Sequence, residues 1–191
     1  DATGIPVQAA TRTAMGSVLP KLYGGFNNEF SFKGFNFAFL FDYRFGNKVL
    51  SATNYYTIFR GLNQITLAGR EGGVVAEGVT ADGSVNTVNV PAQTYYQNLA
   101  RRISALNVMD GSFIKLRQIT VGYTLNKKQL GILPFESVGI SLVARNLFTL
   151  LKYTDNIDPE AGFSSQINYA GIEGSSLPTT RTYGFNLNIK F

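Results

Sequence analysis

The chain of 191 residues contains no cysteine and no histidine. Their absence removes disulfides, thiolate zinc sites, imidazole general bases and the Ser-His or Cys-His pairs of many hydrolases. Carboxylates, guanidinium and amino groups, amides and hydroxyls are the polar groups that remain. The composition therefore does not favour an enzyme, and we expect no cofactor.

The strongest candidate for a metal site is an oxygen-rich group of four residues: Asp155, Asn156, Asp158 and Glu160. The group departs from an EF-hand loop because Ile157 stands where a ligand is needed and Pro159 where a glycine is needed. The glycine-rich stretch GREGG lacks the Lys-Ser/Thr ending of a phosphate-binding loop and is typical of a turn. We expect neither a metal nor a bound nucleotide.

Two sets of residues have the chemistry to hold a ligand without reacting with it. Asp42 and Arg44 share a parity in one predicted strand and would point to the same side of it. Their alternative role is an ion-pair ladder with Arg145 and Glu29. Four aromatic residues offer a flat apolar face and a hydroxyl, which suits stacking on sugar rings or peptide side chains: Tyr55, Tyr56, Tyr95 and Tyr96. The alternative for these is packing of loop helices, because their spacing is helical.

The net charge of +5 raises the possibility of a nucleic-acid partner. The basic residues are scattered, however, and the acidic residues are interleaved with them along the chain. Only Arg101 with Arg102 and Lys127 with Lys128 are adjacent. No aromatic-basic platform of the kind found in RNA-binding domains is present. We therefore expect no nucleic-acid partner.

The elements that must position these residues are strands. The stretch FNFAFLFDYRFG from Phe35 places an aromatic ring at every second residue up to Phe45, with Asn36, Asp42 and Arg44 between them. A period of two is typical of a strand, because successive side chains point to opposite faces. The same alternation recurs along the chain, which gives five predicted strands at residues 23–32, 35–46, 112–125, 138–148 and 180–191. In the third strand the parity changes, and a β-bulge near Arg117 and Gln118 would account for it.

The aromatic side of these strands favours lipid over a soluble core, since six rings in a row are difficult to interdigitate in a core. A transmembrane strand needs about 9 to 11 residues, with aromatic girdles and a polar inner face. No apolar run in the chain approaches the ~18 residues of a spanning helix. The pattern therefore predicts a transmembrane β-barrel, and the alternative is a soluble β-sandwich such as a carbohydrate-binding module or adhesin.

Five consecutive barrel strands would leave two open edges, which hydrocarbon does not tolerate. The amino end has neither an initiating Met nor a signal sequence. We therefore expect these strands to be the carboxyl-terminal piece of a larger barrel chain.

The connections predict the topology and its orientation. Lys33 and Gly34 form a tight hairpin connection, while the segments 1–22, 47–111 and 149–179 are long. Short periplasmic turns and long extracellular loops are typical of outer-membrane barrels, so we expect the long segments outside and the carboxyl terminus in the periplasm. Two short loop helices are predicted, one over Ala52–Arg60 and one that begins at Pro91.

Four phrases follow one another along the sequence: GFNFAFLFDYRFGNKVLSATNYY, DGSFIKLRQITVGYTL, ISLVARNLFTL followed by YTDNIDPE, and RTYGFNLNIKF. Together they resemble the last strands of SusC/RagA-family TonB-linked outer-membrane transporters. The resemblance covers nearly the whole chain and is weakest before Leu22 and from Arg60 to Val90. It implies an all-β fold, namely the last five antiparallel strands of a barrel of about 22 strands whose extracellular loops carry short helices.

The resemblance also implies a function in the bacterial outer membrane. Such proteins import oligosaccharides or peptides with energy from the TonB complex, around a plug domain that we expect outside this sequence, and with a SusD-like surface lipoprotein as a lid. The expected partners are thus the rest of the barrel and its plug, the lipoprotein, the TonB complex and the lipid bilayer. A passive porin or other outer-membrane channel is the alternative, because it shares the strand pattern but has no plug.

The carboxyl-terminal phrase resembles the signal by which the barrel assembly machinery recognises its clients. The residues that carry this resemblance are Gly184, Leu187, Ile189 and Phe191. Completion of a lipid-facing alternation accounts for Phe191 equally well, and both roles are compatible.

Overall fold

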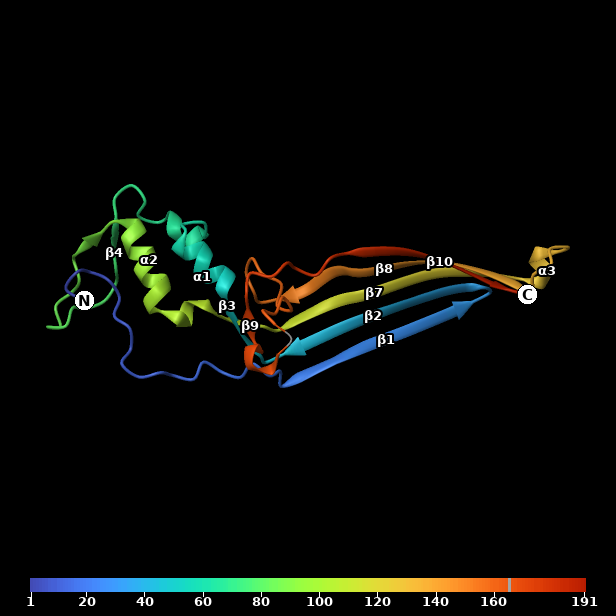
Figure 1. Cartoon of the computed structure of the whole chain (residues 1–191), viewed down its shortest axis with the longest axis horizontal. Helices are drawn as coiled ribbons and strands as arrows, with labels where there is room; N and C mark the ends of the chain where they lie inside the picture. The colour runs from blue at the N-terminus through green and yellow to red at the C-terminus, as the bar shows by residue number, and fades with distance from the viewer. Residues whose placement is uncertain (165) are drawn as a thin grey trace. The chain divides into compact units, whose positions relative to one another are not determined.

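The computed structural model describes residues 1–164 and 166–191. These residues form two compact units. We call residues 20–47, 111–154 and 178–191 the sheet unit, and residues 1–19, 48–110 and 155–177 the loop unit. The sheet unit carries the long strands, and the loop unit carries the two longer helices (Figure 1).

The sheet unit is one antiparallel sheet of five strands in the order β1-β2-β7-β8-β10 (Figure 1). The five strands are β1 (Leu22–Phe32), β2 (Phe35–Phe45), β7 (Phe113–Asn126), β8 (Ser137–Lys152) and β10 (Thr182–Lys190). The prediction of five antiparallel strands is confirmed. Strands β1 and β10 are the two edges of this sheet.

Register aligns the apolar residues of all five strands on one face. One row crosses the whole sheet, because each member lies directly opposite the next: Phe30, Phe37, Val121, Leu142 and Phe185. The exposed fractions of these five side chains range from 40% for Phe37 to 62% for Leu142. Contiguous exposed apolar surface of this extent is typical of a membrane or partner interface rather than of a free soluble surface.

The neighbouring row, one residue along each strand, is polar or small throughout. It consists of Ser31, Asn36, Gly122, Ser141 and Asn186, again each opposite the next. Hydrogen bonds join part of this row, since the Ser31 hydroxyl lies 2.7 Å from the Asn36 side-chain oxygen. Because adjacent rows face opposite sides of a sheet, the two faces differ in character along the same strands.

A bulge in β7 keeps the apolar face continuous. Leu40 and Phe41 are consecutive in β2 but pair with Gln118 and Leu116, which leaves Arg117 as the extra residue. The predicted bulge near Arg117 and Gln118 is therefore confirmed. One extra residue reverses the parity of the strand, so both ends of β7 present apolar side chains to the same side.

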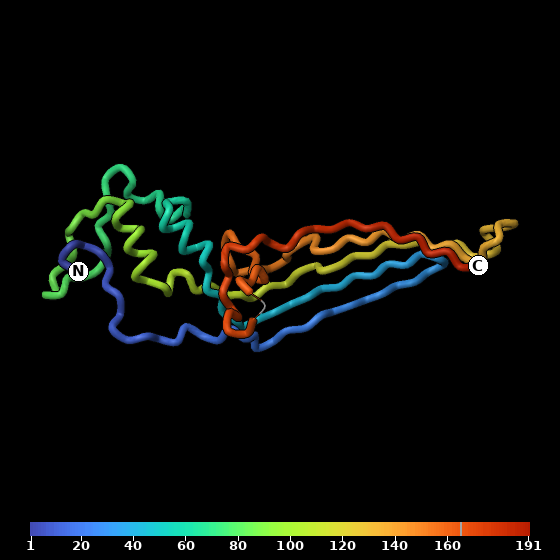
Figure 2. The backbone as a smooth tube through the Cα atoms, viewed as in Figure 1, coloured from blue at the N-terminus to red at the C-terminus, as the bar shows by residue number. Residues whose placement is uncertain are grey.

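The short connections have the local geometry that tight turns require. Lys33 and Gly34 have φ of 48° and 93°, and two positive φ angles are the signature of a type I′ hairpin turn. The connection from β7 to β8 holds a helical turn, α3 (Lys127–Leu130), which begins with a capping box between Asn126 and Gln129. The sequence patterns did not predict α3. Both connections and the carboxyl terminus lie at the same end of the sheet (Figure 2).

The loop unit is built around two helices, α1 (Ala52–Phe59) and α2 (Ala92–Arg102). Both were predicted from the helical spacing of their apolar residues, although α2 begins after Pro91, which is its N-cap. Ser51 starts α1 because its side chain accepts a hydrogen bond from the backbone N–H of Asn54 at 3.0 Å. The helices pack against one another through Ile58, Ala92, Tyr96 and Ala100.

Short elements complete the loop unit. A three-stranded sheet has the order β6-β3-β9, with β3 (Lys48–Ser51) antiparallel to β6 (Val108–Asp110) and parallel to β9 (Ile172–Glu173). A two-stranded sheet joins β4 (Val74–Val75) to β5 (Asn89–Val90). Three 3-10 helices are η1 (Gln64–Leu67), η2 (Ser104–Asn107) and η3 (Ile167–Tyr169). Strand β9 thus ties the segment 155–177 to the segment 48–110.

Among the residues that the structure describes, no helix has the length and apolar character needed to span a membrane.

Candidate functional site

The four tyrosines proposed from the sequence all lie on α1 and α2, but in different surroundings. Tyr96 is buried, and its hydroxyl donates a hydrogen bond to the carbonyl of Ala68 at 3.2 Å. Tyr95 contacts the Tyr96 ring edge-on at 5.2 Å. Burial raises the pKa of Tyr95, and the neighbouring Tyr96 adds to this effect. Tyr96 belongs to the buried cluster between the two helices and Tyr95 packs against that cluster, which is the packing role given above as the alternative.

The two tyrosines of α1 differ from one another. Tyr55 stacks on Phe59 with ring centroids 5.9 Å apart, and it packs against the buried cluster of the two helices. Tyr56 is 54% exposed, and its ring meets the edge of Tyr55 at 5.1 Å. Of the four, Tyr56 is the one whose face is most available to a ligand.

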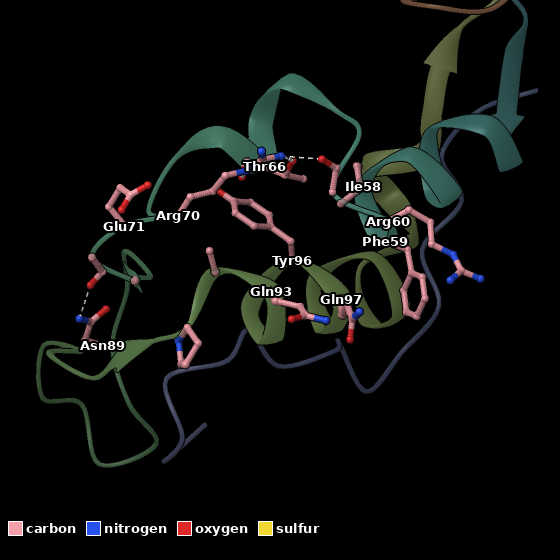
Figure 3. A pocket seen from close by; sticks show the side chains of 15 residues that line it. Ile58, Phe59, Arg60, Thr66, Arg70, Glu71, Asn89, Gln93, Tyr96 and Gln97 are labelled. Atoms are coloured by element: carbon pink, nitrogen blue, oxygen red, sulfur yellow. Dashed lines mark hydrogen bonds between the residues drawn. The ribbon is translucent and has the colours of Figure 1, made fainter.

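A cleft of about 960 Å³ opens in the loop unit between the two helices and the segment that follows α1 (Figure 3). Its labelled lining residues are Ile58, Phe59, Arg60, Thr66, Arg70, Glu71, Asn89, Gln93, Tyr96 and Gln97. Polar and charged side chains stand among apolar ones in this lining, so the cleft suits a ligand that carries both kinds of group. The sequence patterns drew attention to the tyrosines but not to this cleft.

Hydrogen bonds fix the wall of the cleft opposite α2. The Arg70 guanidinium donates to the carbonyls of Thr66 and Gly61 at 2.9 and 2.6 Å and to the Thr66 hydroxyl at 3.1 Å. The Asn89 side-chain amide donates to the carbonyl of Gly72 at 2.6 Å. Because Arg70 is occupied in this way, it acts as a brace of the wall, and the remaining charged groups of the cleft are Arg60 and Glu71.

Phe59 and Arg60 line one end of the cleft, and a second cation, Arg101, contacts the Phe59 ring without lining the cleft itself. The guanidinium groups of Arg101 and Arg60 lie 4.7 and 5.6 Å from the centroid of the Phe59 ring. We call Phe59, Arg60 and Arg101 the guanidinium clamp. Arg60 is the C-cap of α1, and Arg101 lies in the last turn of α2, so the ends of both helices form it.

Asp42 and Arg44, the sheet candidates, have partners that were not predicted. Asp42 pairs with Arg117, the extra residue of the β7 bulge, and not with Arg145 or Glu29. The bulge directs both Arg117 and Gln118 to the polar face, and Gln118 accepts a hydrogen bond from Arg145 at 3.0 Å. The Arg44 guanidinium lies 5.5 Å from the centre of the Phe113 ring.

The Asp42–Arg117 pair belongs to a longer network. Arg117 also donates to the side-chain oxygen of Asn146 on β8 at 3.2 Å, and Asn146 donates to the carbonyl of Thr180 at 3.0 Å. Asn146 adopts φ of 54°, a backbone conformation that Asn tolerates better than most residues. The network therefore links β2 to Thr180, two residues before β10. A contact of Asp42 or Arg44 with substrate remains a prediction.

A buried carboxylate that the sequence analysis missed lies in the loop unit. Glu173 on β9 is 1% exposed, and it accepts hydrogen bonds from the hydroxyls of Ser51 and Thr53 at 2.7 and 2.8 Å. The backbone N–H groups of Thr53 and Ser175 donate to it at 3.1 and 2.5 Å. Burial alone would raise the pKa of Glu173, but these hydrogen bonds outweigh it, so the pKa is lowered.

The oxygen-rich group at residues 155–160 has a local structural role. The Asp158 carboxylate accepts a hydrogen bond from the backbone N–H of Glu160 at 3.1 Å, as in an Asx turn. Within the described ranges, no group of three or more acidic, cysteine or histidine side chains is placed to hold a metal ion.

The residues of the proposed assembly signal lie on the edge strand β10 and at the terminus. Leu187 and Ile189 point to the apolar face opposite Ile140 and Val138, as their register shows. Gly184 belongs to the polar face. Phe191 is 79% exposed, and its ring meets that of Phe135 edge-on at 5.3 Å. Recognition by the assembly machinery remains a prediction.

Comparison with known proteins identifies relatives of this arrangement. TonB-dependent receptor P3 of Formosa agariphila is 28% identical over 191 residues, which cover 97% of this chain and 18% of the receptor. TonB-dependent receptor P39 of the same organism is 28% identical over 193 residues, with 96% of this chain and 17% of the receptor covered. The chain resembles SusC/RagA-type TonB-dependent transporters. It spans less than a fifth of the length of these relatives.

Solved structures support the same fold. The RagAB peptide importer in its closed-closed state matches with a TM-score of 0.61 at 22% identity, over 93% of this chain and 18% of the matched chain. Its open-open state matches with a TM-score of 0.60 at 21% identity over 98% of this chain. No protein-family model matches the sequence.

Proposed function

We propose that this chain forms the last five strands of the barrel of a TonB-dependent importer in the bacterial outer membrane. The observation that carries the proposal is the exposed row from Phe30 through Phe37, Val121 and Leu142 to Phe185, with a polar row beside it. A soluble β-sandwich would cover such a face with a second sheet. In a bilayer the acyl chains solvate the apolar row, and water or a plug domain contacts the polar row.

The edges and connections of the sheet support the proposal of a larger barrel and its orientation. Strands β1 and β10 each pair with a single neighbour among the described residues, so further strands of the same protein would close the barrel. The family resemblance sets their total at about 22. The tight turn, α3 and the carboxyl terminus share one end of the sheet, which we assign to the periplasm (Figure 2). The loop unit, built from the long connections, is then extracellular.

A SusD-like surface lipoprotein is the proposed lid, and the loop unit offers apolar surface for it. Leu62, Ile65 and Leu67, around η1, are 78%, 45% and 58% exposed, and Tyr56 is 54% exposed. Exposed apolar residues grouped on one short segment are typical of a partner interface. The RagAB likeness is consistent with a two-component importer.

The proposed mechanism is gated uptake of oligosaccharides or peptides. Substrate would bind under the lid against polar groups of the segment 46–110, and the TonB complex would supply the energy that opens a path past the plug. No covalent step is involved. A passive porin would use the same strand pattern without TonB.

Uptake of labelled oligosaccharides and peptides by cells that carry the full-length transporter tests this proposal. Uptake is expected to fall to background when TonB is removed, since the plug then stays in place and closes the barrel. Uptake that persists without TonB would support the porin instead. A protein recovered from the soluble fraction without detergent would support the carbohydrate-binding module or adhesin.

A further inference from the structure

The guanidinium clamp carries positive charge that the protein does not neutralise. Among the described residues, neither Arg60 nor Arg101 has a carboxylate within salt-bridge distance, whereas the adjacent Arg102 pairs with Asp1 at 2.8 Å. Both unpaired guanidinium groups lie against the same Phe59 ring, so their like charges are held near one another. A ligand anion would relieve that repulsion.

Helix dipoles explain only part of this arrangement. The carboxyl end of a helix carries roughly half a negative elementary charge and stabilises a nearby cation. Two helix ends therefore offset about half of the charge of two guanidinium groups. About one positive charge is left, which matches a single carboxylate bound through the planar donor fork of arginine.

The opposite end of the cleft has the opposite charge. Phe59 and Arg60 stand at one end and Glu71 and Asn89 at the other (Figure 3). Glu71 is exposed and has no hydrogen-bond or ion-pair partner in the described part of the chain. The cleft thus has a cationic end and an anionic end.

Amide side chains line the cleft between its charged ends. Gln93 and Gln97 are four residues apart on α2, so they lie on the same face of the helix, and both line the cleft (Figure 3). Each offers donors and an acceptor that match the N–H and C=O groups of a peptide backbone.

We propose that this cleft binds a short peptide with its carboxyl terminus at the guanidinium clamp and its amino terminus towards Glu71. The volume of about 960 Å³ is at the upper end of ordinary ligand sites, which leaves room for several residues. An acidic oligosaccharide offers a carboxylate to the clamp but no cation to Glu71. The inference rests on the proposed function, because it names the substrate class that the extracellular loop unit selects.

Binding of four probes to the full-length transporter in detergent tests the inference. The probes are tetra-alanine, its carboxyl-amidated form, its amino-acetylated form and tri-galacturonate, measured by calorimetry. Amidation is expected to weaken binding about tenfold, as the loss of a charge-assisted contact does. The R60Q/R101Q variant is expected to bind the free peptide about tenfold more weakly as well. Its affinity for the amidated peptide is expected to equal that of the unmodified transporter. In the same way, acetylation of the amino terminus and Glu71→Gln are each expected to weaken binding. Acetylation is expected to cause no further loss of affinity in the Glu71→Gln variant.

A matched control is Arg181→Gln, which removes a guanidinium that lies 5.9 Å from the Phe148 ring in the sheet unit. This variant is expected to bind all four probes like the unmodified protein. Limited proteolysis of each variant checks that the loop unit stays folded. Equal affinity for free and amidated peptide overturns the inference, and so does tight binding of tri-galacturonate that is insensitive to Glu71→Gln.

Binding in detergent does not depend on TonB, so the outcome is separate from that of the uptake experiment. If R60Q/R101Q cells retain TonB-dependent uptake while the probes bind the variant normally, the import function stands and the cleft assignment fails. If the probes bind as expected but uptake does not need TonB, the cleft assignment stands and the import mechanism fails.

Discussion

The hydroxyl of Ser51 donates a hydrogen bond to the carboxylate of Glu173 at 2.7 Å, across 122 positions of sequence. This contact joins the start of α1 to β9. Glu173→Ala would leave the Ser51 and Thr53 donors without their acceptor in a buried site. We expect a local loss of about 1–3 kcal/mol, seen as faster amide exchange in the first turn of α1. Glu136→Ala, at an exposed carboxylate, should leave that exchange unchanged.

Acidification should act on the same contact. The lowered pKa of Glu173 means that its folded-state value lies below the ordinary 4.5, so the charged form favours the folded loop unit. That stabilisation is complete above the ordinary value and is lost as pH falls through the folded-state pKa. Opening of the loop unit can be followed by trypsin cleavage at Arg60. Samples are held at a series of pH values from 7 downwards and returned to neutral pH only for a short pulse of trypsin. Cleavage is expected to increase as the pH of the incubation falls. In Glu173→Gln the rise should be absent, and an identical acid response in that variant would contradict the assignment.

The hairpin between β1 and β2 requires glycine at its second position. Gly34 has φ of 93°, and a Cβ there would meet the carbonyl oxygen of Thr124 at 2.8 Å. Gly34→Val is expected to cost at least about 1–2 kcal/mol, the usual penalty for a left-handed conformation. The change in gel mobility that accompanies heat unfolding of the barrel should occur at a lower temperature in this variant than in the unmodified protein. Gly139→Ala, where a Cβ makes only ordinary contacts at 3.4 Å and beyond, serves as the control.

The Asp42–Arg117 pair should show strong coupling in a double-mutant cycle. Asp42→Asn removes the carboxylate that accepts from the Arg117 guanidinium, and Arg117→Met removes the cation from Asp42. Each single variant and the double variant lose the same contact, so the loss of stability in the double variant is expected to be smaller than the sum of the two single losses. Urea unfolding of the detergent-solubilised transporter measures the coupling. Strictly additive losses would mean that the pair is only a surface contact.

The sequence was sufficient for those parts of the fold that depend on local periodicity. Alternation located β2 and β10, helical spacing located α1 and α2, and the parity change at Arg117 located the bulge. These signals are local because strand and helix faces repeat every two and every three to four residues. The adjacent positive φ angles at Lys33 and Gly34 follow from the same local chemistry.

The partners of the polar residues could not be predicted in this way. Asp42 was expected beside Arg145, but the extra residue in β7 places Arg117 there instead, and a shift of register by one residue changes every neighbour. Glu173 escaped notice because its donors Ser51 and Thr53 lie far away in sequence. The cleft was also missed, since it depends on how α1, α2 and the intervening segment pack, which single-residue spacing does not encode.

The carboxyl-terminal residue offers a test of the assembly signal. Phe191→Ala is expected to reduce the amount of folded transporter in the outer membrane several-fold while Phe135→Ala, which removes only its ring partner, does not. Quantitative immunoblotting of membrane fractions measures the difference. Equal losses in both variants would instead assign Phe191 a packing role against Phe135.

The lipid-facing assignment of the apolar row is tested most directly by spin labels on single introduced cysteines, since this segment contains none of its own. Labels at Phe37, Val121 and Phe185 should be accessible to oxygen, which partitions into acyl chains, in transporter reconstituted into vesicles. Labels one residue along, at Asn36, Gly122 and Asn186, should be more accessible to a water-soluble nickel complex or shielded from both reagents. If the first set proves inaccessible to oxygen, or the alternation between the two sets is missing, the apolar row does not face lipid and the transporter account is contradicted.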